Sequence, residues 1–477
     1  MNKKLNDFLN YIKGKRVALL GFGISNSSIV DFLLGAGAEV TVRDKKENIA
    51  GRDGYEARGV RFITGEEYLS GMDEDIIFRS PGIRPDIPEL AEAVARGSHL
   101  TSEMECFLAA CPCPVYAVTG SDGKSTTTTI THLLLSATHR SFLGGNIGEP
   151  LLHRLPQIHA HDRVAVELSS FQLMTIDAPV AAAAITNVTP NHLNWHTDMG
   201  EYIEAKKRIL RHAGRAVLNY GNAVTRQIGE ELQRDNGIPV LFFSREPVPR
   251  TALRPTDGAI YIEDGAIVTE FAGDEKRYLM TLDEIKLPGL HNAENYMTAI
   301  ALTWGQCPVE AIIETAGTFG GVEHRLEFVA EKKGVVYING SIDSSPTRTA
   351  AALSAIPERS IVLICGGYDK HIPFAPLAEA ILSHPGVHDL VLTGATAEMI
   401  GRAMTDDPRY AARVEGGFRM TIVPDFDEAF HSAVAKAKPG DTVLLSPACA
   451  SFDAFPNFEV RGRHFKTLVH GLSDSNM

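Results

Sequence analysis

The sequence predicts an α/β protein with three domains, and three observations support this fold class. The chain has 477 residues, which corresponds to three domains at about 150 residues each. Three stretches open with a short apolar strand, a glycine-rich turn and a helix. Strands that alternate with helices in this way are typical of parallel sheets covered by helices. We therefore expect domains at 1–103, 104–321 and 322–477.

The first stretch predicts a Rossmann-like N-terminal domain. Its strand at 16–20 runs into Gly21-Phe22-Gly23, and later strands are predicted at 39–44 and 75–78. The turn lacks the third glycine of the dinucleotide-binding fingerprint, although Asp44 lies about where a ribose contact is expected. This pattern alone leaves open a NAD site, a site for another nucleotide and a purely structural turn.

The second stretch predicts a central α/β domain built around a phosphate-binding loop (P-loop). A strand at 115–119 leads through Thr119-Gly120-Ser121-Asp122-Gly123-Lys124-Ser125-Thr126 into a helix, which is the context that such a loop requires. The glycines would let backbone N–H groups approach phosphate oxygens, Lys124 would reach the terminal phosphates, and Ser125 would hold Mg²⁺. Val118 stands where the common spacing has glycine, so the loop is a shortened variant.

Further strands and a hairpin are predicted in this central domain. The dipeptide Asp264-Gly265 between two alternating segments indicates the hairpin. The remaining elements are strands at 163–166, 182–186, 216–218 and 240–243 and a closing helix at 291–304.

Three residues downstream of the loop are candidates for its chemistry. Glu167 ends a predicted parallel strand, where a carboxylate next to a phosphate loop is an expected Mg²⁺ ligand. His192 and His196 have i, i+4 spacing, but Leu193 stands where a zinc protease needs glutamate, so a polar or capping contact is the plainer interpretation of His192. Lys206 lies in an amphipathic helical pattern and, by itself, indicates a solvated surface lysine.

The third stretch predicts a C-terminal doubly wound α/β domain. Its strands are predicted at 335–338, 361–364, 390–392, 420–423 and 442–445. Loops at the carboxyl ends of such strands form ligand sites, and two of them stand out. The loop 446–458 combines small residues, hydroxyls and aromatic rings, and the loop 366–370 ends in Lys370, a candidate anchor for an anion.

Composition and charge argue against several classes of function. With 46 Lys and Arg against 59 Asp and Glu, the net charge is −13 without any basic run, which argues against nucleic-acid binding. No segment approaches the roughly 18 to 20 apolar residues of a membrane span. The six cysteines form no CxxC pair and no secretion signal is present, so we expect a cytoplasmic protein with no membrane partner.

In their order along nearly the whole chain, these motifs resemble the Mur ligase family. The matching segments are Ser80-Pro81-Gly82, the P-loop, Gly145-Asn146-Ile147-Gly148, 167–172, 186–189, 290–295, His324-Arg325, Gly366-Gly367 and 446–458. The resemblance implies that ATP activates the carboxylate of UDP-N-acetylmuramoyl-L-alanine as an acyl phosphate, from which the amine of D-glutamate displaces phosphate. It places the reaction in cytoplasmic peptidoglycan precursor synthesis, and we expect a monomer.

The resemblance also implies a role for each matching residue. ATP would be bound by Gly120, Ser121, Asp122, Gly123, Lys124, Ser125, Thr126, Asn292, Asn295 and Arg325. The UDP-sugar would be bound by Ser25, Lys45, Lys46, Ser80, Gly82 and Asn146, so the first glycine-rich turn would bind UDP instead of NAD. D-Glutamate would be bound by Ser344, Lys370, Ser451 and Phe458.

For the metal, the resemblance implies two Mg²⁺ ions held by Ser125, Glu167, His192 and carbamylated Lys206. Carbamylation turns the amine into a carboxylate-like ligand, and the match around Lys206 overrides its interpretation as a surface lysine. The implied catalytic residues are Lys124, Glu167, His192 and Lys206.

The chain departs from the family pattern at 340–345, where an Asp-Ser-Lys-Ala-Thr-Asn block is usual. Gly340 removes the acid expected on the ATP ribose, and Ile342 removes a lysine. We hypothesise that Asp343 partly replaces the ribose contact. The nearest alternative function is another Mur-type or folylpolyglutamate-like ligase with a different amino-acid acceptor. More distant alternatives are a NAD-dependent oxidoreductase and a non-catalytic, nucleotide-regulated scaffold.

Overall fold

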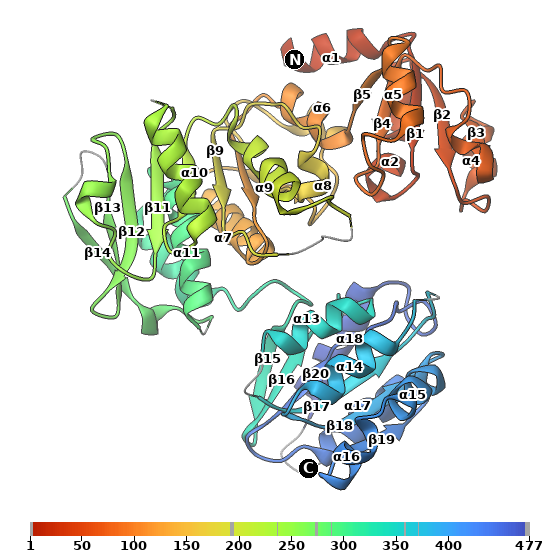
Figure 1. The fold of residues 1–477 in the computed structure, drawn as a ribbon, viewed down its shortest axis with the longest axis vertical. Helices are drawn as coiled ribbons and strands as arrows, with labels where there is room; N and C mark the ends of the chain where they lie inside the picture. The colour runs from red at the N-terminus through yellow and green to blue at the C-terminus, as the bar shows by residue number, and fades with distance from the viewer. Residues whose placement is uncertain are drawn as a thin grey trace. The chain divides into compact units, whose positions relative to one another are not determined.

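The computed structural model describes residues 3–190, 195–235, 237–271, 275–287, 289–356, 359–370 and 372–472. The chain forms two compact units, Met1–Phe319 and Gly320–Met477 (Figure 1). The first unit contains two β-sheets and the second contains one. The limits predicted for three domains stay predictions; the one at 103 coincides with the first residue of helix α6 (Glu103–Ala110).

The N-terminal part of the first unit is a five-stranded parallel sheet in the order β3-β2-β1-β4-β5. This Rossmann-like order has its switch point between β1 and β4, and it agrees with the predicted fold class. The strands are β1 (Arg16–Leu20), β2 (Glu39–Asp44), β3 (Arg61–Thr64), β4 (Ile76–Arg79) and β5 (His99–Thr101). The helices are α1 (Lys3–Ile12), α2 (Ile24–Ser27), α3 (Val30–Gly35), α4 (Arg52–Glu56), α5 (Pro88–Ala95) and the 3-10 helix η1 (Gly65–Leu69).

The rest of the first unit is built on a nine-stranded sheet in the order β14-β13-β12-β11-β10-β9-β6-β8-β7. Its strands are β6 (Val115–Thr119), β7 (Ser141–Gly145), β8 (Arg163–Glu167), β9 (Ala182–Ile185), β10 (Ala216–Asn219), β11 (Val240–Ser244), β12 (Gly258–Glu263), β13 (Ala266–Glu270) and β14 (Arg277–Thr281). The strands are parallel except at β12-β13 and β13-β14. The predicted hairpin joins β12 to β13 through Asp264 and Gly265, whose φ angles of 49° and 75° are those that a tight hairpin turn needs.

Helices cover both faces of this sheet. Alternate residues of a strand point to opposite faces, and both faces of the buried strands are apolar, so each face needs a layer of helices to bury it. Val118 faces α7 and α11, which supply Leu134 and Tyr296 to one core, whereas Ala117 faces the core that includes Tyr202 of α9. The α-helices are α6, α7 (Lys124–Ser136), α8 (Ser170–Leu173), α9 (Met199–Lys207), α10 (Ala223–Arg234), α11 (Leu290–Thr303) and α12 (Val309–Thr318). The 3-10 helices are η2 (Leu152–Gln157), η3 (Arg208–Leu210), η4 (Arg250–Ala252) and η5 (Leu282–Glu284).

The second unit is a six-stranded sheet in the order β15-β16-β20-β17-β18-β19, with only β15 antiparallel to its neighbour. The strands are β15 (Glu327–Lys332), β16 (Val335–Asn339), β17 (Ser360–Gly366), β18 (Val387–Thr393), β19 (Arg419–Ile422) and β20 (Asp441–Leu445). The helices are α13 (Pro346–Ser354), α14 (Ala375–Ser383), α15 (Ala397–Asp406), α16 (Tyr410–Glu415), α17 (Phe426–Lys436) and α18 (Phe458–Gly471). Leu377 of α14 packs on one face and Phe465 of α18 on the other, which gives the predicted doubly wound arrangement.

In the part of the chain that the structure describes, no helix is both long enough and apolar enough to cross a bilayer.

Candidate nucleotide and metal site

The P-loop joins β6 to α7 and requires glycine at two positions. Gly120 has a φ of +149° and Gly123 a φ of +77°, backbone conformations that other residues rarely adopt. A Cβ atom at Gly120 would lie 1.9 Å from Thr186 Oγ1, and one at Gly123 would lie 2.3 Å from Asn295 Oδ1. The two glycines therefore allow neighbouring segments to approach the loop backbone closely.

Two asparagines predicted to contact ATP lie on α11, beside this loop. Asn295 Oδ1 accepts a hydrogen bond from Thr127 Oγ1 at 3.1 Å, and Asn295 Nδ2 donates to Asn292 Oδ1 at 3.2 Å. Lys124 Nζ donates to the Ser121 carbonyl oxygen at 2.8 Å, so its side chain folds back over the loop. These contacts gather the predicted ATP residues of the first unit, whereas Arg325 belongs to the second unit.

Glu167 is a buried carboxylate at the carboxyl end of β8. It is 1% exposed and accepts hydrogen bonds from Ser125 Oγ at 2.6 Å and from Asn146 Nδ2 at 2.7 Å. Both of these partners are neutral, and a buried carboxylate is costly unless a cation balances its charge. Hydroxyl and carboxylate oxygens are hard ligands that suit Mg²⁺. Ser125 and Glu167 therefore fit a magnesium ion, with Asn146 orienting the carboxylate.

Lys206 is buried on α9 beside the same loop. Its side chain is 1% exposed, and its Nζ donates to the Gly120 carbonyl oxygen at 2.7 Å and lies 4.5 Å from the centroid of the Tyr202 ring. Burial, together with the charge of Lys124, lowers the pKa of Lys206 to about 6. The amine is therefore largely neutral at pH 7. The interpretation of Lys206 as a solvated surface lysine is wrong, because an amphipathic pattern does not show which neighbours cover the helix.

The two histidines of the sequence pair have different standings. His192 falls within 191–194, outside the described residues, so its predicted role is a prediction still. His196 is 2% exposed, with Nδ1 at 3.0 Å from Glu201 Oε2 and Nε2 at 2.9 Å from Ser170 Oγ. Burial lowers the pKa of His196, which favours the neutral ring.

Five of the six residues predicted for the sugar nucleotide follow three strands of the N-terminal sheet at their carboxyl ends, whereas the sixth, Asn146, follows β7 of the nine-stranded sheet. The five are Ser25 in α2, Lys45 and Lys46 after β2, and Ser80 and Gly82 after β4. Asp44 Oδ2 accepts a hydrogen bond from Phe22 N at 2.6 Å, and its Oδ1 accepts one from Lys46 N at 2.7 Å. This carboxylate therefore braces the loops after β1 and β2, which accounts for Asp44 without a ribose.

In the second unit, two of the four residues predicted for D-glutamate contact each other. Lys370 Nζ donates to the carbonyl oxygen of Ser344 at 3.1 Å and to its Oγ at 3.2 Å. Ser451 is buried in the loop after β20, and Phe458 begins α18. The Phe458 carbonyl oxygen accepts a hydrogen bond from Ser341 Oγ at 2.8 Å. The four residues thus lie in the segments that follow β16, β17 and β20, three of them in loops and Phe458 at the start of α18.

Arg461 is a residue of this region that the sequence analysis missed. It is 2% exposed on α18, and its guanidinium donates to the carbonyl oxygens of Ser341 at 2.9 Å and of Cys449 and Ala450 at 3.1 Å each. It therefore ties the loop after β16 to the loop after β20. An arginine in a helix with several charged residues gives no sequence signal of such burial.

Asp343 lies where the family pattern is broken. Its Oδ2 accepts a hydrogen bond from Ser446 Oγ at 2.9 Å, and a Cβ atom at Gly340 would lie 2.7 Å from the same oxygen. The carboxylate therefore occupies the space in which a side chain at 340 would begin. Burial raises the pKa of Asp343 to about 6. Its hypothesised contact with the ATP ribose is still a prediction.

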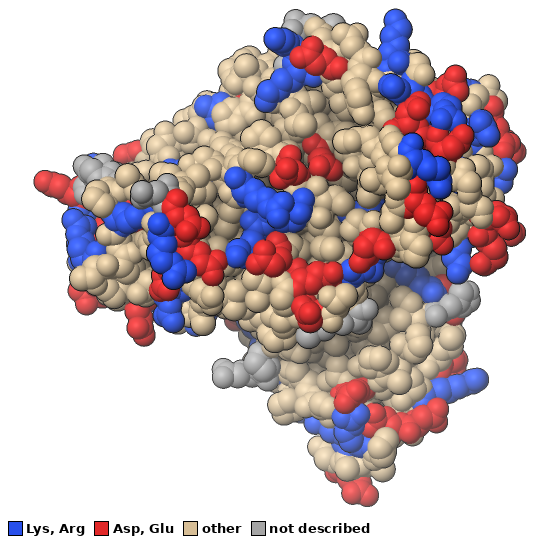
Figure 2. Space-filling view, turned by 45° about the horizontal axis from the view of Figure 1, so that its top comes forward, with Lys and Arg blue, Asp and Glu red and all other residues tan. Residues whose placement is uncertain are grey.

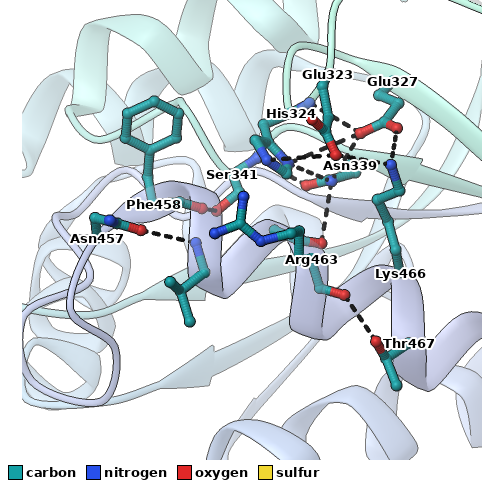
Figure 3. Close-up of polar contacts among 12 residues, drawn as sticks. Glu323, His324, Glu327, Asn339, Ser341, Asn457, Phe458, Arg463, Lys466 and Thr467 are labelled. Atoms are coloured by element: carbon teal, nitrogen blue, oxygen red, sulfur yellow. Dashed lines mark hydrogen bonds and ion pairs between the residues drawn. The ribbon is translucent and has the colours of Figure 1, made fainter.

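Figure 3 shows a second acidic cluster, which has the composition of a metal site. Ligand atoms of Glu323, His324 and Glu327 all lie within 4.8 Å of one another. Lys466 Nζ lies 3.0 Å from Glu323 Oε1 and 2.6 Å from Glu327 Oε1, and Asn339 Nδ2 donates to Glu327 Oε2 at 3.0 Å. The Lys466 ammonium supplies the positive charge that a metal would bring, and we assign no metal here.

Surface charge is mixed on the face drawn in Figure 2. Among its coloured residues, groups of Lys and Arg are bordered by Asp and Glu instead of merging into one basic field. The expectation that nucleic acid is not a ligand, which rests on the net charge of −13, stays a prediction.

Comparison with known families matches all three parts of the chain. The models of the Mur ligase MurD-like N-terminal domain, the Mur ligase middle domain and the Mur ligase glutamate ligase domain match residues 15–102, 118–303 and 324–449.

Individual relatives cover nearly the full length. The UDP-N-acetylmuramoylalanine–D-glutamate ligase of Clostridium novyi (strain NT) is 42% identical over 482 residues, or 99% of this chain and 100% of that protein. The protein of the same name from Ruminiclostridium cellulolyticum is 42% identical over 480 residues, with the same coverage. Among solved structures, the UDP-N-acetylmuramate-alanine ligase of Thermotoga maritima shares the fold, with a TM-score of 0.53 and 19% identity over 96% of this chain and 99% of its own.

Proposed function

This chain belongs to the Mur ligase family, and we propose that it is the ligase that joins D-glutamate to UDP-N-acetylmuramoyl-L-alanine with hydrolysis of ATP. Relatives of that name, 42% identical over 99% of the chain, support the choice of substrates. Within the site, the observation that carries the proposal is that a buried Glu167 and a buried, largely neutral Lys206 each hydrogen-bond to the same P-loop, Glu167 to Ser125 and Lys206 to Gly120. The product belongs to peptidoglycan precursor synthesis.

The reaction needs two anions to meet, because the alanine carboxylate of the UDP-sugar attacks the γ-phosphate of ATP. Two groups can offset the negative charge of the phosphates: the ammonium of Lys124 and the backbone N–H groups at the N-terminus of α7. Mg²⁺, when bound by Ser125 and Glu167, would neutralise phosphate charge. The amine of D-glutamate then attacks the acyl carbon of the resulting acyl phosphate and displaces phosphate through a tetrahedral intermediate. A C–N bond forms, the C–O bond to phosphate breaks, and the amine nitrogen loses a proton.

Lys206 is proposed to act as a carbamate. Only a neutral amine adds to CO₂, and the lowered pKa of Lys206 keeps its amine neutral near pH 7. The addition forms a C–N bond and releases one proton to solvent, which leaves a monoanionic, carboxylate-like group. Together with Ser125, Glu167 and His192, this group would complete the ligands of two Mg²⁺ ions.

The remaining substrate contacts follow the assignments already described. Ser25, Lys45, Lys46, Ser80, Gly82 and Asn146 would bind the UDP-sugar, and Ser344, Lys370, Ser451 and Phe458 would bind D-glutamate. The Lys370 ammonium would pair with a carboxylate of the amino acid, the contact for which a placed cation is best suited. We also propose that the enzyme works as a cytoplasmic monomer, which a molar mass from light scattering can check.

The direct test is release of phosphate from ATP in the presence of UDP-N-acetylmuramoyl-L-alanine and one of three amino acids. We expect phosphate release with D-glutamate and only background with L-alanine or meso-diaminopimelate. Turnover with one of the latter two would show another acceptor specificity. Binding of NADH by the whole chain, measured by fluorescence, would instead favour the oxidoreductase alternative.

The carbamate has its own test. Carbon-13 NMR with labelled bicarbonate is expected to show a carbamate signal that is lost in Lys206→Ala, with a fall in kcat of at least about 100-fold. Lys207→Ala is the matched control, because the neighbouring Lys207 is 30% exposed and pairs with Glu231 on α10. A fully active Lys206→Ala enzyme would refute the role.

A further inference from the structure

We infer that Arg84, Trp195, His196 and Glu201 form a positioning network that sets Glu167 and Lys206 relative to the loop after β4. We call it the Arg84 network. The inference rests on the proposed function, and of its four residues only His196 stands out in the sequence, through its spacing from His192.

Arg84 is the centre of the network. Its Nη2 donates to Glu201 Oε1 at 2.7 Å and its Nη1 to Glu201 Oε2 at 3.1 Å, a two-bond pairing of guanidinium and carboxylate. The Arg84 Nη1 also donates to the Trp195 carbonyl oxygen at 2.7 Å, and its Cζ lies 5.0 Å from the centroid of the Trp195 ring. Arg84 and Glu201 are each 22% exposed, so the pair is largely shielded from solvent.

His196 extends the network to α8. Its Nδ1 faces Glu201 Oε2 at 3.0 Å and its Nε2 faces Ser170 Oγ at 2.9 Å. Glu201 Oε2 also accepts a hydrogen bond from Thr197 N at 2.9 Å. The ring centroids of Trp195 and Phe171, which is also on α8, lie 4.3 Å apart. Polar and aromatic contacts therefore both join α8 to the segment 195–201.

The segments that meet here are those that carry proposed site residues. Arg84 lies in the loop that begins with Ser80, Glu201 is in the first turn of the helix whose last turn carries Lys206, and Ser170 follows Glu167 by three positions. A change in the Arg84 network would therefore shift two proposed metal-binding side chains against a proposed sugar-nucleotide loop. Groups that orient metal ligands from behind affect metal affinity and activity by about 10- to 100-fold when they are removed.

An ordinary stabilising ion pair is the competing explanation. Exposed pairs contribute little, and pairs that only stabilise would not link ligand affinity to turnover. Lys207 and Glu231 provide that comparison within the same region, because they pair at 3.0 Å but lead from α9 to α10, away from the P-loop.

The experiment measures Mn²⁺ binding by electron paramagnetic resonance, with a non-hydrolysable ATP analogue and the full chain. The variants are Arg84→Ala, Arg84→Lys, Glu201→Gln and the control Glu231→Gln. We expect Mn²⁺ affinity and kcat to fall by about 10- to 100-fold in Arg84→Ala and Glu201→Gln, with the KM for ATP within about two-fold of wild type. Arg84→Lys keeps the charge but loses the two-bond geometry, so its loss is intermediate.

Two results would overturn the inference. One is a Mn²⁺ affinity within two-fold of wild type in both Arg84→Ala and Glu201→Gln. The other is an equal loss in Glu231→Gln. Glu201→Gln has nearly the same shape as the wild-type side chain, so it decides the matter if Arg84→Ala fails to fold. A wild-type enzyme without turnover of D-glutamate would refute the proposed function only, because the Mn²⁺ affinities still test the Arg84 network.

Discussion

Glu167 in the first unit and Glu327 in the second both sit among polar groups typical of a metal site, yet they balance their charge differently. Glu167 is 1% exposed and hydrogen-bonds to the hydroxyl of Ser125 and the amide of Asn146. Glu327 is bonded at 2.6 Å to the ammonium of Lys466. A buried carboxylate whose hydrogen-bond partners are neutral needs a bound cation to balance its charge, whereas a carboxylate that pairs with a lysine ammonium of the chain does not.

If Glu167 binds Mg²⁺ as proposed, the difference indicates that the partners of a carboxylate, more than the number of acids nearby, mark a metal site. By composition the second cluster is the richer, since Glu323, His324 and Glu327 converge within 4.8 Å. Its internal ammonium makes it a structural cluster.

The largest effect is expected for Glu167→Gln, which removes the negative charge but keeps the shape. We expect kcat to fall by about 10³-fold, because charge at the transferring phosphoryl group is no longer neutralised. Mn²⁺ titration of wild type, Glu167→Gln and the matched Glu327→Gln provides the measurement. An equal loss of Mn²⁺ affinity in Glu327→Gln would contradict the distinction between Glu167 as a metal ligand and Glu327 as a structural carboxylate.

Lys206→Met is expected to change how stability depends on pH. The folded-state pKa of about 6 lies below the ordinary value of 10.5, so the unfolded chain binds more protons between these pH values. Wild-type stability should therefore rise with pH across this window, by up to about 1.4 kcal/mol per pH unit relative to Lys206→Met. Urea denaturation in CO₂-free buffer between pH 6.5 and 9 tests this; parallel curves would contradict the burial of a neutral amine.

Removing the Lys466 ammonium should allow the cluster of Glu323, His324 and Glu327 to bind a metal ion. Lys466→Met leaves Glu323 and Glu327 without their ammonium, and we expect the unfolding free energy to fall by about 2 kcal/mol. Added Mn²⁺ or Zn²⁺ should raise the melting temperature of this variant more than that of wild type. A variant that gains no response to either metal would show that Lys466 is not what keeps metal away.

The smallest effect concerns Asp343, whose hydrogen-bond partner is the Ser446 hydroxyl. Because burial raises the pKa of Asp343 to about 6, ionisation opposes folding, and wild-type stability should fall as pH rises from about 4 to 6. Asp343→Asn removes that dependence, and we expect a gain of about 1 kcal/mol at pH 8. Its ATP affinity, measured by calorimetry, tests the hypothesised ribose contact at the same time.

The strands that the sequence did not predict share a physical reason. Buried central strands such as β1 and β6 are continuous apolar runs and could be placed within a residue or two. The missed strands β3, β5, β7, β14 and β15 are all sheet edges. Edge strands are half-exposed and tolerate charged residues, as in Glu327–Lys332, so their hydrophobic signal is weak.

The residues of the candidate site also differ in how much local sequence signal they carry. The P-loop and Glu167 could be proposed from local order because their roles follow from a strand, a turn and a helix. Burial of Lys206 and Arg461, and the contacts of Arg84, depend on segments far apart in the chain. No local pattern records them, so Lys206 was recognised through family resemblance and the two arginines not at all.

The two P-loop glycines carry a consequence for engineering. Because a side chain at 120 would meet Thr186 and one at 123 would meet Asn295, each glycine shares its space with a distant partner. Libraries that vary either position singly are expected to return only glycine. Libraries for this loop should vary residues in pairs, 120 with 186 and 123 with 295, so that a larger loop residue is combined with a smaller partner.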